Sequence, residues 1–106
     1  MLNTTTITRE GTQIVIRGDL VFDTALQVLS DSRSLLALSA AWNICLAHVP
    51  HADSAGLALL IFWFRQARVQ NKTVCVSDIP VQMQKLINVS GLNYILPLVP
   101  KVHSPV

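Results

Sequence analysis

Hydrophobic and polar residues follow one another in blocks along the chain, and the longest apolar block is an unbroken run of eight residues, Leu57–Phe64. At about 100° per residue, its spacing predicts a helix. Most of its apolar positions gather on one side, as a core-facing stripe does. These positions are Leu57, Leu60, Ile61, Phe64 and, one turn further, Ala67.

Leu59 and Phe62 fall on the opposite side of this expected helix, with Trp63 on its flank. A helix that is apolar nearly all round is normally buried on all sides, and a chain of 106 residues has little material to cover both faces. Two interpretations are open. The outer residues are scattered surface apolar groups, which are common, or they form a face that binds a partner, which contiguous apolar patches usually mark. We favour the second.

A polar joint, His51–Gly56, precedes the apolar run. Asp53 and Ser54 are residue types favoured at helix starts, because their side-chain oxygens accept hydrogen bonds from amides that lack an intrahelical partner. Gly56 has no side chain, so a neighbouring backbone can come close to the helix there. The sequence therefore predicts a structural joint and a small polar site at a helix tip.

Strands and helices alternate along the rest of the chain. Residues Thr4–Thr8 and Gln13–Arg17 predict a hairpin that turns at Glu10-Gly11. Further strands are expected at Trp42–Val49 and Thr73–Ser77. A last edge strand at Tyr94–Val99 is limited by the prolines within and after it.

Two more helices are expected. The first covers about Thr24 to Leu38, with Asp23 as its cap. One of its faces carries Phe22, Leu26, Leu29, Arg33 and Leu36. The other begins after Asp78 and Pro80 and ends at Gly91.

This order, β-β-α-β-α-β-α, predicts an α/β domain with a mostly parallel sheet. We expect one domain over residues 1–106, with a core at about 4–99 and a flexible tail at 100–106. Ligands of such sheets sit beyond the carboxyl ends of the strands. The loop from Val49 to Ser54 is therefore expected at the functional edge.

The composition is 51% hydrophobic and 13% charged, with a mean hydropathy of +0.47. That balance suggests that something else covers part of the apolar surface. No apolar run approaches the roughly 18–20 residues of a transmembrane helix, and the first residues lack an apolar signal region, so a cytoplasmic location is expected.

Cys45 and Cys75 lie in apolar runs, which favours buried thiols over a disulfide.

Charge excludes one class of partner. The net charge of +2 comes from dispersed residues, whereas nucleic-acid binders usually show a basic stripe with aromatic residues between the cations. Arg65, Arg68 and Lys72 follow one helix and indicate its solvated end. Nucleic acid is therefore not expected as a partner.

The residues predict no catalytic group, cofactor or metal. The four glycines form no phosphate-binding loop, and the residues around Ser54 lack the first glycine of a nucleophile elbow. His51, Asp53 and Ser54 are too close along one loop for a catalytic triad. His48, His51 and His103 have no metal-ligand spacing with either cysteine.

Ser54 has three possible roles. It is a helix cap, a phosphorylation site, or an unmodified polar contact for a partner. A phosphate there would be held by the free amides and the helix dipole but repelled by Asp53. Its roughly two negative charges would be enough to expel an apolar or acidic partner.

Three short motifs resemble those of STAS domains, the family of the anti-sigma factor antagonists. Asp53-Ser54-Ala55-Gly56-Leu57 is similar to the family's D-S/T-x-G-L signature. Gly18-Asp19-Leu20 resembles its G-E/D-L after the second strand, and residues 88–92 resemble its closing S/T-G-L. The resemblance implies a four- to five-stranded, mostly parallel sheet with an N-terminal hairpin and with helices packed on one side.

Within this family, residues 56–60 and the short C-terminus most resemble the MlaB-type subunits of phospholipid ABC transporters. That implies a non-enzymatic subunit which binds an MlaF-like ATPase on the cytoplasmic side of the inner membrane. The family's contact surface corresponds here to Pro50–Trp63. The partner-binding residues expected from it are Pro50, His51, Asp53, Ser54, Ala55, Leu59, Phe62 and Trp63.

Ser54 keeps an alternative open. MlaB-type proteins commonly carry Thr at this position, and Ser is the residue that the antagonists phosphorylate. The chain is alternatively an anti-sigma factor antagonist whose partner is an anti-sigma factor kinase. A small-ligand-binding module has no support beyond the polar loop. The isolated domain is expected to form a homodimer through its apolar helix.

Overall fold

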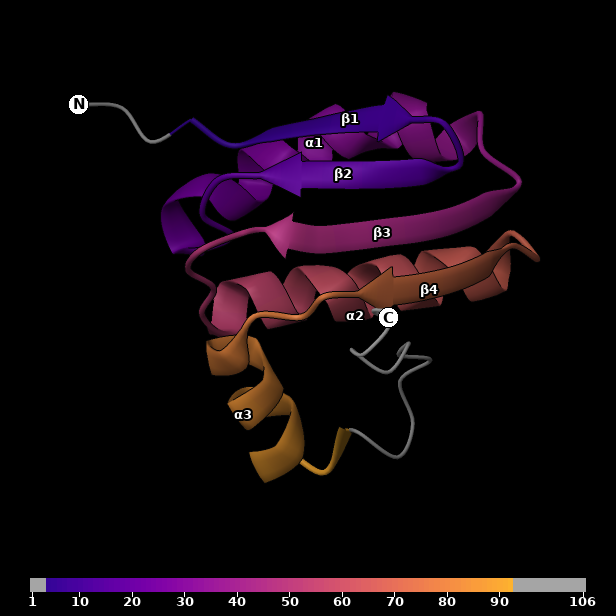
Figure 1. Cartoon of the computed structure of the whole chain (residues 1–106). Coiled ribbons are helices and arrows are strands. Elements are labelled where there is room, and N and C mark those ends of the chain that lie inside the picture. Colours follow the sequence, from indigo (N-terminus) through magenta and orange to yellow (C-terminus); the bar gives the residue numbers. More distant parts are fainter. Residues whose placement is uncertain (1–3, 93–106) are drawn as a thin grey trace, which may run out of the picture.

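The computed structural model describes residues 4–92, which form four strands and three helices in the predicted order (Figure 1). The elements are β1 (Thr6–Glu10), β2 (Gln13–Arg17), α1 (Phe22–Ala37), β3 (Ala41–His48), α2 (Ser54–Val69), β4 (Thr73–Ser77) and α3 (Val81–Val89). The predicted edge strand Tyr94–Val99 and the tail 100–106 lie outside the described residues.

The strands form one mixed sheet in the order β1-β2-β3-β4. β1 and β2 pair antiparallel as the predicted hairpin, whereas β2 with β3 and β3 with β4 are parallel. The sheet is therefore mostly parallel, as predicted. Ile14 lies beside Ile44 across the β2–β3 pair, and Ile44 beside Val76 across the next, which places β-branched side chains in a row on the core face.

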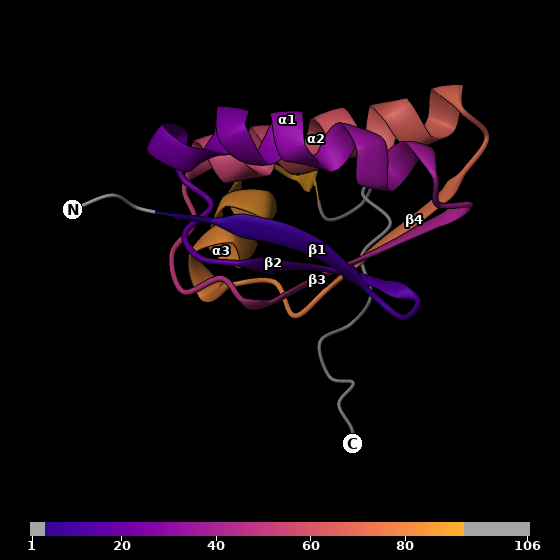
Figure 2. The same cartoon turned by 90° about the horizontal axis from the view of Figure 1, so that it is seen from above.

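α1 and α2 lie side by side over one face of the sheet, and α3 packs near the start of α2 (Figure 2). Because β2 and β3 are parallel and each is followed by a helix that returns over the sheet, α1 and α2 run in the same direction. The core between the layers includes both tryptophans, Trp42 and Trp63, which are fully buried.

The start of α1 differs from the prediction. The helix begins at Phe22 with Val21 as its N-cap, and Asp23 lies in the first turn. The Thr24 hydroxyl accepts a hydrogen bond from the Val21 amide at 3.1 Å and donates one to the Asp19 carbonyl at 2.7 Å. This buried threonine takes the capping role that the sequence assigns to Asp23.

The face of α1 that enters the core also differs from the apolar stripe. Its buried residues are Thr24, Val28, Ser32 and Leu36. The hydroxyl of Ser32 donates to the Leu29 carbonyl at 2.8 Å, so the face can be buried because its polar groups are satisfied. As a result, Phe22 and Leu26 are 80% and 78% exposed.

Both cysteines are free thiols, as predicted; Cys45 is buried and Cys75 half-buried. Within residues 4–92, no helix combines the length and the apolar character that spanning a membrane requires.

Candidate functional site

The carboxyl ends of β2 and β3 meet at one edge of the sheet, where the loops leading into α1 and α2 lie side by side (Figure 1). The two loops continue the parallel pairing through a bridge between Leu20 and Ala52. The Leu20 amide donates to the His51 carbonyl at 2.9 Å, and the Asp53 amide donates to the Leu20 carbonyl at 3.4 Å. The start of α2 is thus held against the start of α1.

Gly56 makes this close approach possible. A Cβ atom at this position would lie 2.4 Å from the Leu20 carbonyl oxygen and 3.2 Å from Cε of Met83. Any side chain there would push α2 away from the loop, so the prediction that a backbone approaches the helix at Gly56 is confirmed.

One carboxylate caps both helices at this edge. Oδ1 of Asp53 accepts a hydrogen bond from the Ala55 amide at 2.8 Å, and Oδ2 accepts one from the Phe22 amide at 3.2 Å. Asp53 is the N-cap of α2, and the bond to Phe22 satisfies a free donor in the first turn of α1. The positive ends of the two helix dipoles share this negative charge.

Ser54 is the first residue of α2 and is exposed. Because Asp53 is the cap, the first of the three roles considered for Ser54 is wrong. Its hydroxyl takes part in none of the side-chain hydrogen bonds found within the described part of the chain. It therefore stands at the helix tip as an accessible polar group.

Two further side chains fix the loop that leads into α2. Nδ1 of His51 lies 3.1 Å from Oδ1 of Asp19 in the neighbouring loop. The Ala52 amide donates to the side chain of Gln82, on α3, at 3.0 Å. The loop is therefore held by the α1 loop and by α3, while Pro50 and His51 remain exposed.

The expectation that Leu59 and Trp63 face outward is wrong. They are 5% and 1% exposed, because α1 lies along this flank of α2. The Trp63 indole donates to the Ser32 hydroxyl of α1 at 3.3 Å. Phe62 is the exposed member of the three, at 37%.

Phe22 and Leu26 are exposed apolar residues that the sequence analysis did not assign to the site. They occupy the same side of α1 as Leu29 and Arg33, since positions 22, 26, 29 and 33 fall within about 60° of one another on a helix. Leu29 and Arg33 line a groove toward α2, and Phe22 and Leu26 lie on the same side of α1, nearer to the helix tips. Their i, i+4 and i+7 spacing is visible in the sequence and predicts a core face, whereas the structure leaves Phe22 and Leu26 exposed.

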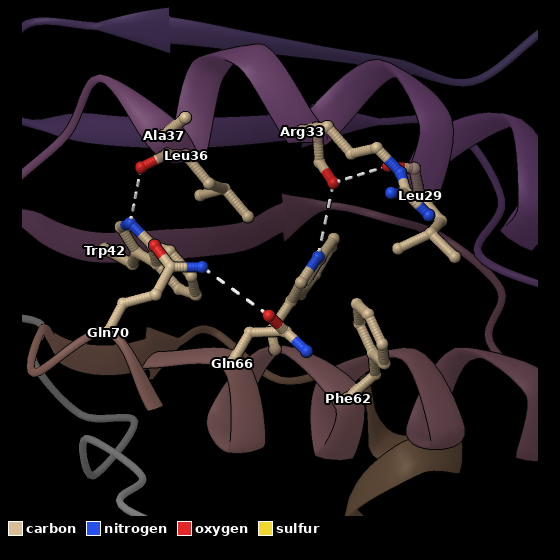
Figure 3. A pocket seen from close by; sticks show the side chains of 10 residues that line it. Leu29, Arg33, Leu36, Ala37, Trp42, Phe62, Gln66 and Gln70 are labelled. Carbon is tan, nitrogen blue, oxygen red and sulfur yellow. Dashed lines mark hydrogen bonds between the residues drawn. The ribbon is translucent and has the colours of Figure 1, made fainter. Parts of the chain in front are cut away.

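This groove runs between α1 and α2 and has a volume of about 230 Å³ (Figure 3). The indole rings of Trp42 and Trp63 are part of its lining, together with the side chains of Arg33, Phe62, Gln66 and Gln70. The Trp42 indole N–H donates to the Leu36 carbonyl at 2.9 Å. Both indole N–H groups are thus used inside the fold.

Two observations bear on catalysis and metal binding. Among residues 4–92, no group of three or more His, Cys, Asp or Glu side chains is placed to hold a metal ion; His103 lies outside the described residues. On the β1–β2 hairpin, Arg17 and Thr8 donate to the Glu10 carboxylate and lower its pKa to about 2. That pair is separate from the helix tips.

Three solved structures with a similar fold are described as anti-sigma factor antagonists. One from Mycobacterium paratuberculosis superposes with a TM-score of 0.72 at 20% identity, over 94% of this chain and 87% of the other. A protein of Thermotoga maritima assigned to the same class gives 0.74 at 10% identity, over 93% and 88%. SpoIIAA in its unphosphorylated form gives 0.67 at 12% identity, over 94% and 91%.

At these identities the structural similarity establishes the fold alone. No curated protein matches the sequence. A family model described as "Mlab, STAS domain" matches residues 3–100, which is nearly the whole chain. With the helix-tip motif in place around Asp53, Ser54 and Gly56, this match shows that the chain belongs to the STAS domain family.

Proposed function

We propose that this STAS domain is a non-enzymatic subunit that binds the ATPase of an MlaB-type phospholipid ABC transporter at the cytoplasmic side of the inner membrane. The observation that carries the proposal is the family match over residues 3–100, whose description names MlaB. Exposed apolar side chains beside the helix tips give such a subunit a surface with which to bind.

We define the docking surface as the exposed side chains of Phe22, Leu26, Ser54, Ala58 and Phe62. The bond between the Asp53 carboxylate and the Phe22 amide holds the first turns of α1 and α2 next to each other. The surface differs from the residues expected from the sequence, because Leu59 and Trp63 are buried and Phe22 and Leu26 replace them. Pro50 and His51 extend it along the loop.

The apolar part of this surface is large enough to matter energetically. Full burial of a Leu or Phe side chain is worth about 1.5–3 kcal/mol, and about four fifths of that remains unrealised at Phe22 and Leu26 in the isolated domain. A partner that covers both therefore gains a few kcal/mol before the costs of association.

The test measures binding of a purified MlaF-type ATPase from the same cell by calorimetry. We expect Phe22→Ser and Leu26→Ser to weaken binding by about tenfold or more each. Val89→Ser on α3 is the matched control, because Val89 is 87% exposed and lies outside the docking surface. Failure of the wild-type domain to bind the ATPase would contradict the proposal.

A second candidate function is that of an anti-sigma factor antagonist regulated by phosphorylation of Ser54. The observation that favours it is the exposed Ser54 hydroxyl at a helix tip, in a fold shared with anti-sigma factor antagonists. Incubation with a cognate anti-sigma factor kinase and ATP should then add the mass of one phosphate. Ser54→Ala should abolish the addition, and an unchanged mass of the wild-type protein argues against this function.

A further inference from the structure

The two flanks of α1 differ in charge. Asp23, Gln27 and Asp31 face a polar hollow beside the N-terminal end of β1, and Gln27 donates to Asp31 at 2.8 Å. The flank toward α2 carries no acidic residue; its charged side chain is Arg33. Acidic and basic groups of α1 are thus on opposite sides.

α2 adds to this asymmetry. Residues Ser54–Val69 contain no Asp or Glu, and their charged residues are Arg65 and Arg68. On a helix, Arg65 lies close to the exposed line of Ala58 and Phe62, whereas Arg68 lies on the other flank. The outer surface of the two helices is therefore apolar near the tips and basic further along, at Arg33 and Arg65.

The groove presents an apolar side chain and a charged side chain that are free to contact a partner. Trp42 and Trp63 form the buried floor of the groove and keep their indole N–H groups within the fold, so the apolar side chain that the groove presents to a partner is Phe62. The guanidinium of Arg33, on the rim, makes no hydrogen bond or ion pair within residues 4–92. Such a groove fits an occupant that is apolar where it meets Phe62 and negatively charged where it meets Arg33 (Figure 3).

We propose that this groove receives an acidic amphipathic helix of the ATPase. Its apolar side chains lie on Phe22, Leu26 and Phe62, and an Asp or Glu near one end pairs with Arg33. The proposal rests on the proposed function and adds the chemistry and the orientation of the partner segment. Phe22 and Arg33 are eleven positions apart, about 16 Å along the helix axis, so the partner helix needs about three turns.

Charge favours this occupant over a second copy of the chain. Two copies that met through this surface would each bring Arg33 and Arg65 to the interface. The nearest carboxylate, Asp53, is already bonded to the amides of both helix tips. Like charges brought together at an interface oppose association. An acidic segment has the opposite sign and makes binding dependent on salt.

The first test uses a matched pair of charge reversals on binding of the purified ATPase. We expect Arg33→Glu to weaken binding by about tenfold and to reduce its salt dependence. Arg68→Glu, on the far flank of α2, should stay within about twofold of the wild type. Equal effects of the two substitutions, with the wild type still binding, would overturn the groove proposal and leave the proposed function intact. Loss of wild-type binding would instead contradict the proposed function.

The second test identifies the occupant directly. Phe62→benzoylphenylalanine in the full chain should photocrosslink to the ATPase, and mass spectrometry of the crosslinked peptide gives its sequence. We expect an amphipathic segment of about three turns with Asp or Glu at one end. A crosslink to a basic segment, or to a second copy of this chain, would refute the proposal.

Discussion

The Gly56→Ala substitution, at the joint between the helix tips, has two opposite effects on the stability of the protein. Gly56 lies in the first turn of α2, and in a helix Ala is favoured over Gly by about 1 kcal/mol. By propensity alone, the substitution should stabilise the protein. The structure predicts the opposite sign, because the added Cβ would lie 2.4 Å from the Leu20 carbonyl oxygen.

The magnitude follows from how little the neighbouring atoms can move. The new contact is about 1 Å shorter than the 3.4 Å at which ordinary contacts begin, and the obstructing atom belongs to the backbone. That carbonyl accepts a hydrogen bond from the Asp53 amide, and Leu20 is fully buried. Overpacking of this kind costs about 1–3 kcal/mol and occasionally more. With the cost near the upper end of this range, about 3 kcal/mol, and about 1 kcal/mol recovered from helix propensity, we expect a net loss of about 2 kcal/mol in the free energy of unfolding.

Urea denaturation followed by circular dichroism measures this difference. A loss of 2 kcal/mol in a domain of this size corresponds to a fall in Tm of about 10 °C. Ala58→Gly is the control, because Ala58 is exposed on the same helix and its replacement should cost only the propensity difference of about 1 kcal/mol. A Gly56→Ala variant as stable as the wild type would refute the packing argument.

Three further predictions concern polar contacts. Asp53→Ala should lower the free energy of unfolding by about 1–2 kcal/mol, measured by urea denaturation, because two helix amides lose their acceptor. Lys72→Met should cost about 1 kcal/mol in the same assay, because the Lys72 ammonium donates to the last two carbonyls of α1 at 3.0 and 3.1 Å. The pKa of Glu10 is lowered from 4.5 to about 2, so its contribution to stability is present above pH 4.5 and is lost as pH falls toward 2. Arg17→Gln should return this pKa toward 4.5 in a carboxyl NMR titration, and an unchanged value would contradict the assignment.

The elements could be predicted because their patterns are local. The expected strand Trp42–Val49 is observed as Ala41–His48, and the helix expected after Asp53 begins at Ser54. The close backbone approach at Gly56 could also be predicted, because a glycine without a side chain lets another backbone come near the start of a helix. These features depend on residues that are close together in the sequence.

The errors concern contacts between distant parts of the chain. The burial of Leu59 and Trp63 depends on α1, and the bond from the Trp63 indole reaches Ser32, 31 residues away. The exposure of Phe22 and Leu26 depends on Thr24 and Ser32, polar residues that can be buried because their hydroxyls are bonded. A hydrophobic pattern counts such residues as exposed, so it assigned the wrong face of α1 to the core.

The two residues of the helix-tip motif have separable tasks. Asp53 is structural, because its carboxylate bonds the amides of both helices, so an Asp53 variant changes the surface and the stability together. Ser54 is exposed and makes none of these bonds, and its replacement by Ala should leave the free energy of unfolding within about 0.5 kcal/mol. Ser54→Ala is therefore the variant that tests the role of the tip in binding, whereas a binding defect in Asp53→Ala has to be corrected for lost stability first.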